Sequence, residues 1–386
     1  MATRNALIVG AGIGGLAAAI ALRQAGWQVR VFERAASPRE LGFALLLAPN
    51  AMHALGALGL ADVARRGGFI TTNGEMRRPD GTVLRRFDTA SARALLDEDA
   101  VCILRPVLHG ALLDALGTAA IELSACVSRF TAATDAVELT LADGRTFAGD
   151  LLVGADGVRS VIRAQLHPDE PPPRPSGLLG VRGVACDVVE ELRGVSGAQY
   201  FGRGMEAGVA RAGERDVYWY MSVSADRFGA ARTAATIAAE CARHFHQPFQ
   251  TIVAKTNSED VRVDELFDRE PIADWGRGPV TLLGDAAHPM LPHAGQGAAQ
   301  ALEDAVALGQ VMRQAVDRRA IDVALRHYEQ VRAVRTRKVV EIARRNARVG
   351  SIRSAAGCWL RDHAIRHVPQ SIILRSLVAF GKPPSP

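Results

Sequence analysis

The sequence predicts an α/β protein in which a Rossmann-like domain carries an inserted antiparallel-sheet domain and is followed by C-terminal helices. Three observations support this fold class. The chain opens with a strand-helix-strand pattern, it contains apolar runs that end in glycine and aspartate, and its middle third alternates apolar and polar residues. The first two patterns are typical of parallel sheets, whereas the third is typical of antiparallel strands.

The Rossmann-like part is predicted from short apolar segments. Ala6–Val9 and Gln28–Phe32 have the pattern of strands, and the small residues of Gly15–Ala25 predict a helix between them. Two later runs, Asp150–Asp156 and Pro279–Asp285, each end in an aspartate just after a glycine. Because parallel strands open into a ligand crevice at their carboxyl ends, we expect a binding site where these segments end.

The inserted domain follows a proline-rich linker, Pro168–Pro175. Its clearest strand, Val217–Val223, has one apolar face and one half-polar face with two tyrosines and a serine. Such a strand packs on one side and offers the other side to a ligand. We therefore expect a first domain over residues 1–175 (with a short excursion near 70–104), an inserted domain over 176–275, a return to the first domain over 276–315, and C-terminal helices over 316–386.

Composition excludes several function classes. The net charge is +5, but there are only three lysines and the arginines are spread along the chain, so we expect no nucleic-acid partner. The five cysteines have no metal-ligand spacing, which predicts no metal and indicates reduced thiols in a cytoplasmic protein. The apolar stretches are too short for stable membrane insertion. Nothing decides between a monomer and a homodimer.

The first motif is GAGIGG at residues 10–15, between the first strand and the helix. Glycines here allow a dinucleotide's pyrophosphate to approach the backbone N–H groups at a helix N-terminus. Glu33 ends the next strand, where a carboxylate accepts hydrogen bonds from a ribose and disfavours NADP. FAD and NAD both remain. We assign to cofactor binding Gly10, Gly12, Ile13, Gly14, Gly15, Glu33 and the adjacent Arg34.

The second motif is GDAAHPMLPHAGQG at residues 284–297, just before a predicted helix that runs to about Arg313. A carboxylate at a strand end can hold a ribityl chain, and the helix N-terminus can stabilise negative charge on a reduced flavin. The alternative is that Asp285 only caps the turn. This motif favours FAD and adds as cofactor residues Gly284, Asp285, Gly295, Gln296, Gly297 and Ala298.

Together with DGVRSVIR at residues 156–163, these motifs resemble the class A flavoprotein monooxygenases, the aromatic-hydroxylase group, from residue 5 to about 350. The resemblance implies tightly bound FAD in the first domain and a small aromatic substrate against the inserted sheet. It also implies that NADH or NADPH binds transiently as the reductant, and that O2 forms a flavin C4a-hydroperoxide that oxygenates the ring. Further cofactor residues implied by the resemblance are Leu46, Arg105, Val127, Asp156 and Gly157.

Catalytic candidates lie on the second motif and on the half-polar strand. Pro292 and His293 precede the flavin-facing glycines, and a histidine has a near-neutral pKa suited to acid–base work, although it can equally serve its own loop. Tyr218 is the third catalytic candidate. Tentative substrate ligands are Tyr220, Arg182, Arg203 and Arg211, since tyrosine and arginine can bind a phenolate or a carboxylate. Urate-type relatives carry an arginine where Glu206 aligns, which argues against urate as the substrate.

Several other functions stay open on this scaffold. The same fold can tailor a larger, polyketide-like natural product by hydroxylation, epoxidation or Baeyer–Villiger insertion. It can also serve a flavin reductase that transfers no oxygen. A flavin halogenase is disfavoured, because the chain lacks the W-x-W-x-I-P segment and a suitable lysine.

Overall fold

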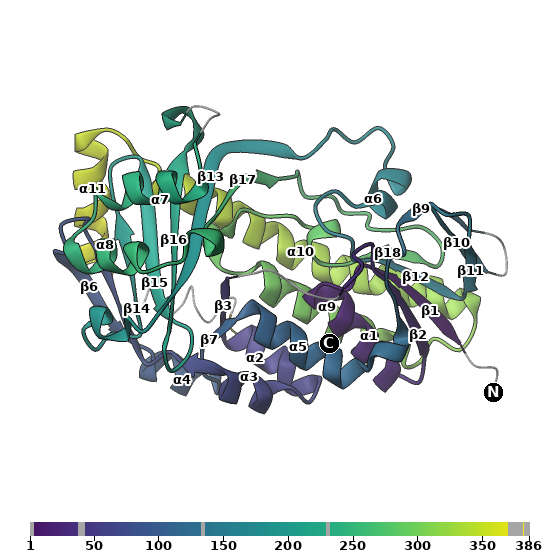
Figure 1. Ribbon diagram of the computed structural model, residues 1–386. Helices are drawn as coiled ribbons and strands as arrows, with labels where there is room; N and C mark the ends of the chain where they lie inside the picture. The colour runs from purple at the N-terminus through teal and green to yellow at the C-terminus, as the bar shows by residue number, and fades with distance from the viewer. Residues whose placement is uncertain (1–3, 38–42, 133–135, 229–231, 370–380, 382–386) are drawn as a thin grey trace.

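The parallel sheet lies at one end of the computed structural model, which describes residues 4–37, 43–132, 136–228, 232–369 and 381 (Figure 1). All of its neighbouring strands are parallel. Their carboxyl ends therefore meet along one edge, as the sequence predicted, and the α/β fold class is confirmed. The strands lie in the order β18 (Val280–Leu282), β12 (Leu151–Gly154), β1 (Asn5–Val9), β2 (Gln28–Phe32) and β8 (Ile121–Glu122).

Helices α1 (Ile13–Gln24) and α9 (Gly297–Met312) pack closely together beside this sheet. Small residues make this approach possible: a side chain at Gly309 of α9 would meet the backbone oxygen of Ala21 at 2.9 Å. Both helices begin near the edge where the parallel strands end. The close packing therefore fixes two helix N-termini next to the predicted crevice.

The second large sheet has seven strands and includes the predicted alternating strand as β16 (Asp216–Ser224). The apolar face of β16 is buried against α7 (Ala234–Ala242) and α8 (Gln247–Ala254), with Trp219 fully buried. The strands lie in the order β17 (Arg262–Asp268), β13 (Arg174–Cys186), β16, β15 (Met205–Arg211), β14 (Gly197–Phe201), β5 (Asn73–Arg77) and β6 (Val83–Asp88).

The first 175 residues contribute to this sheet as well. β5 pairs in parallel with β14, and β6 then forms the sheet edge. The region near residues 70–104, predicted as a short excursion of the first domain, thus supplies two strands to the second sheet. Sequence alternation did not reveal this, because the pairing joins strands more than a hundred residues apart.

Two small sheets and the remaining helices complete the described chain. One sheet pairs β9 (Val127–Ala132), β10 (Val137–Leu141) and β11 (Thr146–Gly149), and the other pairs β3 (Ala44–Leu47), β7 (Val101–Leu104) and β4 (Gly68–Ile70). The remaining helices are α2 (Pro49–Ala57), α3 (Ala61–Gly67), α4 (Ala90–Leu96), α5 (Arg105–Leu116), α6 (Val161–Leu166), α10 (Arg318–Gly350) and α11 (Ala355–His367).

The C-terminal region begins with α10, which Figure 1 shows running from the parallel sheet toward the seven-stranded sheet. α11 then lies against β6 at the far edge of that sheet. Most of the predicted C-terminal segment after residue 369 lies outside the described residues. Among the described residues, no helix has the length and apolar character needed to cross a membrane, and no cluster of three metal-ligating side chains occurs.

Candidate active site

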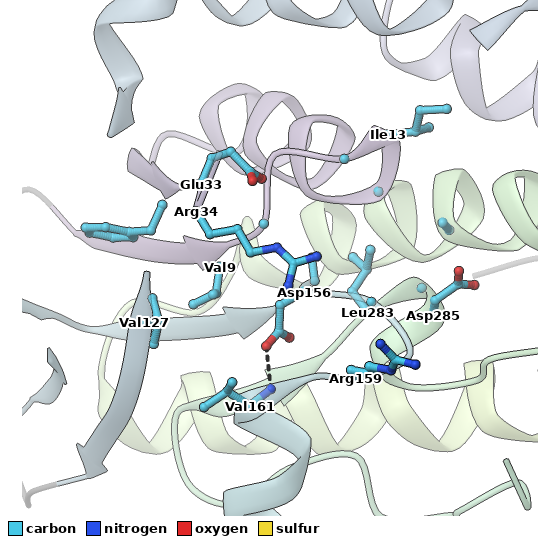
Figure 2. A pocket seen from close by; sticks show the side chains of 18 of the residues that line it. Val9, Ile13, Glu33, Arg34, Val127, Asp156, Arg159, Val161, Leu283 and Asp285 are labelled. Atoms are coloured by element: carbon cyan, nitrogen blue, oxygen red, sulfur yellow. Dashed lines mark hydrogen bonds between the residues drawn. The ribbon is translucent and has the colours of Figure 1, made fainter. Parts of the chain in front are cut away.

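A cavity of about 490 Å³ opens where β1, β2, β12 and β18 end. Figure 2 shows side chains that line it, with Val127 and Glu33 toward one side and Asp285 toward the other. Of the predicted cofactor residues, those that line it are Gly10, Gly12, Ile13, Gly14, Glu33, Arg34, Arg105, Val127, Asp156, Gly157, Gly284, Asp285, Gly297 and Ala298.

The glycine-rich turn between β1 and α1 needs its glycines for space. Gly10 has φ +103°, and a Cβ there would lie 2.4 Å from the carbonyl oxygen of Ala155. A Cβ at Gly15 would lie 1.9 Å from the carbonyl oxygen of Gly10. Gly12 caps α1 without any side-chain hydrogen bond, so the first N–H groups of the helix remain available to an anion.

Glu33 is partly engaged by its own loop. Its carboxylate accepts hydrogen bonds from the backbone N–H groups of Ala11, at 2.8 Å, and Ala35, at 2.9 Å. Each carboxylate oxygen has a second acceptor position, so Glu33 can still accept from a ribose diol. The carboxylate thus fixes the glycine-rich turn and remains able to contact the cofactor.

Asp156 and Arg163 position the turn that carries Asp285. Asp156 accepts hydrogen bonds from Ser160 Oγ at 2.5 Å and from the Val161 backbone N–H at 2.7 Å. Figure 2 shows the bond from Val161. Burial raises the pKa of Asp156, although these donors oppose the shift. The buried Arg163 donates to the carbonyl oxygens of Ala286, at 3.0 Å, and Ala287, at 2.7 Å. The DGVRSVIR segment at residues 156–163 therefore supports the second motif.

Asp285 is exposed within the cavity, on a short helical turn, η5 (Gly284–Ala286). The surrounding protein raises the pKa of its carboxyl, whereas the charges of His288 and Arg105 favour the ionised form. His288 in turn hydrogen-bonds to the buried Asp304 at 2.6 Å, and the N–H of Gly284 donates to the same carboxylate at 3.0 Å. Asp304 on α9 was not predicted, yet it fixes this turn.

Asp304 belongs to a buried charged network between α9 and α10. Burial would raise its pKa, but His288 and Arg332 hold the pKa of Asp304 at about 2. The guanidinium of Arg332 donates to Asp304 at 2.6 Å and also pairs with Glu303. Glu303 also accepts a hydrogen bond from Asn50 of α2 at 2.6 Å. The network ties three helices together behind the cavity.

Four predicted cofactor residues do not line the cavity: Gly15, Leu46, Gly295 and Gln296. Leu45 lines it instead of Leu46, whose side chain is half exposed. Gly295 adopts φ +62° just before α9, and the Gln296 side chain bonds to Asn50 at 3.0 Å. These two residues shape the entry to α9.

A polar residue that the sequence reasoning missed is Arg159, which lines the cavity opposite Arg34 (Figure 2). Arg159 lies inside the DGVRSVIR segment at residues 156–163, and this position could have indicated its role from sequence. Together with Arg34 and Arg105, it adds positive charge to a cavity whose ligand carries a pyrophosphate.

The half-polar face of β16 lies next to segments that also line the cavity. Tyr218 contacts the ring of Phe43 at 6.4 Å and packs near Ala44 of β3, whose neighbour Leu45 lines the cavity. Tyr220 stacks with Tyr218 at 6.1 Å. Burial raises the pKa of both tyrosines, so both hydroxyls are protonated at neutral pH. Among the described residues, neither hydroxyl has a hydrogen-bond partner.

His293 connects this face to the loop before α9. Its side chain is 1% exposed, and its Nε2 lies 3.0 Å from Ser222 Oγ and 3.6 Å from Glu206 Oε1. Burial lowers the pKa of His293 to about 4, so the ring is neutral. Asn346 of α10 donates to its carbonyl oxygen at 3.0 Å. The adjacent Pro292 is exposed on the short turn η6 (Pro292–Ala294).

The three predicted substrate arginines take different positions. Arg182 lies beside Tyr220 on the same face, pairs with Asp264, and places its guanidinium 5.0 Å from the Phe43 ring. Arg203 instead donates to the carbonyl of Arg353 in a separate surface hollow, and Arg211 donates to turn carbonyls at 3.0 and 3.1 Å. The structure thus brings Arg182, but not the other two, to Tyr218 and Tyr220.

The cavity fits FAD on its own geometry. Gly10 and Gly15 leave no room for a Cβ, the first turns of α1 and α9 carry no acidic residue, and an acidic side chain lies near each end of the cavity. This arrangement can hold the pyrophosphate at α1, the adenosine ribose at Glu33 and the ribityl chain at Asp285.

Comparison with known proteins agrees with this geometry. A family model described as FAD binding domain matches residues 3–343. The chain is 37% identical to an aurachin C monooxygenase/isomerase of Stigmatella aurantiaca over 361 residues, covering 93% of each chain. It is 34% identical to a 3-hydroxybenzoate 6-hydroxylase of Aquipseudomonas alcaligenes over 354 residues, covering 88% of each.

A solved structure extends the comparison to three dimensions. The crystal structure of a Klebsiella pneumoniae protein complexed with FAD and uric acid matches with a TM-score of 0.91 and 27% identity, over 98% of this chain and 97% of that one. A salicylate hydroxylase substrate complex shares the fold with a TM-score of 0.77. The predicted family and cofactor are thereby confirmed: the chain belongs to the FAD-binding family of flavin-dependent aromatic hydroxylases, and its cofactor is FAD.

Proposed function

We propose that the protein uses NADH or NADPH and O2 to hydroxylate a small aromatic or heteroaromatic ring. In this reaction one oxygen atom enters the ring as a hydroxyl group, the other leaves as water, and the reduced nicotinamide supplies two electrons. The observation that carries the proposal is the proximity of the FAD cavity to two unpartnered tyrosine hydroxyls. Strand β3 contributes Leu45 to the cavity and packs its neighbour Ala44 near Tyr218.

Protein groups would bind and orient the ring, while bound FAD supplies the redox chemistry that activates O2. The Tyr218 and Tyr220 hydroxyls can donate to or accept from a ring hydroxyl. Ala44, Cys102 and Ala212 form an apolar patch against Tyr218, which favours exclusion of water.

We assign a positioning role to His293. Its ring is buried between the loop and the sheet, and Ser222 occupies its Nε2. The Nδ1 of His293 is buried and has no hydrogen-bond partner among the described residues, and the contact of Nε2 with Ser222 holds Pro292 and the start of α9 in place. The exposed Pro292 can contact the substrate directly.

A second candidate function is oxygenation followed by isomerisation of the product. The name of the Stigmatella aurantiaca relative, a monooxygenase/isomerase, favours it. The two functions differ in product rather than in cofactor: both add one oxygen atom, and only the second rearranges the carbon or heteroatom skeleton.

A product assay under labelled oxygen tests both. Purified holoenzyme receives NADH or NADPH and a panel of phenols, benzoates, pyridines, quinolines and larger polycyclic compounds, and mass spectrometry reads the products. One labelled oxygen atom per product supports the monooxygenase, and fragmentation distinguishes simple hydroxylation from rearrangement. Nicotinamide oxidation with peroxide release and no labelled product for any compound would instead indicate a flavin reductase.

A further inference from the structure

Glu206 lies within the polar cluster on the cavity-side face of the seven-stranded sheet. Glu206 of β15 pairs with Ser222 of β16, and Gly208 pairs with Tyr220. A Cβ at Gly208 would lie 2.3 Å from the Tyr220 ring, so the ring extends across β15 toward Glu206. The cluster therefore contains a carboxyl, a serine and two tyrosine hydroxyls within one patch.

The surroundings of Glu206 disfavour a negative charge. Its side chain is 5% exposed, and its Oε2 touches Gly350, the last residue of α10. The C-terminal end of a helix carries partial negative charge, which opposes a carboxylate. Burial raises the pKa of Glu206 to about 8, and only the more distant Arg361 of α11 counters it. Glu206 is therefore a neutral carboxylic acid at pH 7.

The contact between Glu206 and His293 is consequently a contact of two neutral groups. His293 Nε2 and Glu206 Oε1 lie 3.6 Å apart, close enough for an ion pair, but burial favours the neutral form of each partner. Transferring the proton from Glu206 to His293 would create two desolvated charges. Neither residue supplies a counter-charge to a ligand.

The two described arginines next to Tyr220 and β17, Arg182 and Arg262, already bind other groups of the protein. Arg182 pairs with Asp264 and lies over Phe43, with its Nε buried and unpartnered among the described residues. Arg262, opposite Arg182 on β17, donates to the carbonyl oxygens of Glu259 and Val261. As far as the described residues show, a ring carboxylate at this face would be desolvated beside a guanidinium whose charge Asp264 already balances.

We propose that the substrate is an uncharged aromatic ring bearing a hydroxyl or an N–H, selected because the described part of this face offers two tyrosine hydroxyls and because Asp264 already balances the charge of its guanidinium, Arg182. This inference rests on the proposed function and narrows its substrate class. It separates the protein from relatives named for benzoates, whose rings carry a carboxylate.

Binding to the oxidised holoenzyme tests the inference without turnover. Isothermal titration calorimetry would compare phenol with 3-hydroxybenzoate, and a hydroxyquinoline with the same ring bearing one added carboxylate. We expect each neutral ring to bind at least about ten-fold more tightly than its acid, because the acid buries an unpaired charge. Equal or tighter binding of the acids would overturn the inference.

Three variants locate the effect. Asp264→Asn frees the Arg182 guanidinium at a half-exposed position, so the preference for the neutral ring should shrink several-fold. Glu206→Gln should leave the preference unchanged at pH 7, because Glu206 is already neutral. Glu265→Gln, an exposed carboxylate facing away on the same sheet, is the matched control and should change nothing.

The outcomes separate this inference from the proposed function. A loss of preference in Glu206→Gln at pH 7, with intact flavin absorbance, would show that Glu206 carries a charge and would contradict the inference. Binding of neither ring in either pair would overturn the substrate class. In both cases the labelled-oxygen assay still decides independently whether the protein is a monooxygenase.

Discussion

The cofactor cavity and the proposed substrate face, which is the half-polar side of β16 with Glu206 and His293, differ in the charge of their buried ionisable groups. Behind the cavity, Asp304 and Arg332 are fully buried and charged, and each is held by a partner of opposite sign. On the substrate face, Glu206 and His293 are also buried, but burial keeps both neutral. The paired charges hold the turn that carries Asp285, whereas the neutral groups of the second region agree with the uncharged ligand that we propose.

The two regions also differ in the kind of atoms that each presents to its ligand. The cavity presents mainly backbone N–H groups at two helix starts, and a Cβ at Gly10 or Gly15 would lie only 2.4 or 1.9 Å from a backbone oxygen. The substrate face presents side chains from neighbouring strands and one loop. Substitutions should therefore affect cofactor retention in the first region and ligand choice in the second.

The largest effect is expected when the charged network loses its cation. Arg332→Met leaves Asp304 and Glu303 buried without their shared guanidinium, which should lower the free energy of unfolding by about 3–5 kcal/mol. Urea unfolding followed by circular dichroism measures this change. The exposed Arg337→Ala on the same helix is the control and should change stability by less than about 0.5 kcal/mol. A loss no larger than the control's would mean that the network does not stabilise the fold.

A smaller effect is expected from the cavity carboxylate. Asp285→Asn keeps the side-chain shape but removes its charge, so FAD affinity should fall by about 1.5–3 kcal/mol, or roughly ten-fold to a hundred-fold. Fluorescence titration of apoprotein with FAD gives the dissociation constant. The exposed Asp169→Asn serves as control. Unchanged affinity in Asp285→Asn would support the alternative that Asp285 only caps its turn.

The substrate face predicts a pH dependence of stability. The pKa of Glu206 is about 8 in the folded protein, above its ordinary value of 4.5. Its contribution to the free energy of unfolding is therefore complete below pH 4.5 and is lost as the pH rises to 8. The folded pKa of His293, about 4, is below its ordinary value of 6.5, so its contribution is complete above pH 6.5 and is lost as the pH falls to 4. Between pH 4.5 and 6.5 the two residues change the free energy of unfolding in opposite directions, and their effects cancel.

Between pH 6.5 and 8 only Glu206 contributes to the pH dependence. The free energy of unfolding of the wild type should therefore fall by about 2 kcal/mol across that interval because of Glu206. Glu206→Gln should remove that loss, which parallel urea titrations of the two proteins at pH 6.5 and 8 can measure. Tyr220 near Glu206 stays protonated in this range, because burial raises the pKa of its hydroxyl, and the charge of Arg361 acts on Glu206 by lowering its pKa. If the free energy of unfolding changed equally with pH in the wild type and in Glu206→Gln, Glu206 would be ionised throughout this range and the prediction would be wrong.

The cofactor region could be predicted from sequence because its parts are contiguous motifs. The spacing of Gly10, Gly12 and Gly15 specifies a turn between a strand and a helix, and the structure places that turn at the cavity. Asp304 and Asn50 were missed, because they support the turn from helices distant in sequence. Their spacing carries no signal for the contact.

The substrate region could be predicted only in part. Alternation along β16 indicated which residues share a face, and the burial of Trp219 confirms the apolar side. It could not show that Arg182 is paired with Asp264 or that Arg203 binds elsewhere, because those contacts depend on neighbouring strands and loops. It also could not reveal that Glu206 is neutral, a property of the packed environment.

The most direct test of the account is a single comparison under labelled oxygen. Holoenzyme with NADH or NADPH receives phenol or a hydroxyquinoline in one set of reactions and the corresponding ring acid in the other. We predict one labelled oxygen atom in the product of a neutral ring, with one nicotinamide oxidised for each product formed, and little product from the acids. Preferred oxygenation of the acids would contradict the neutral substrate face, and peroxide release without labelled product from any ring would contradict the monooxygenase itself.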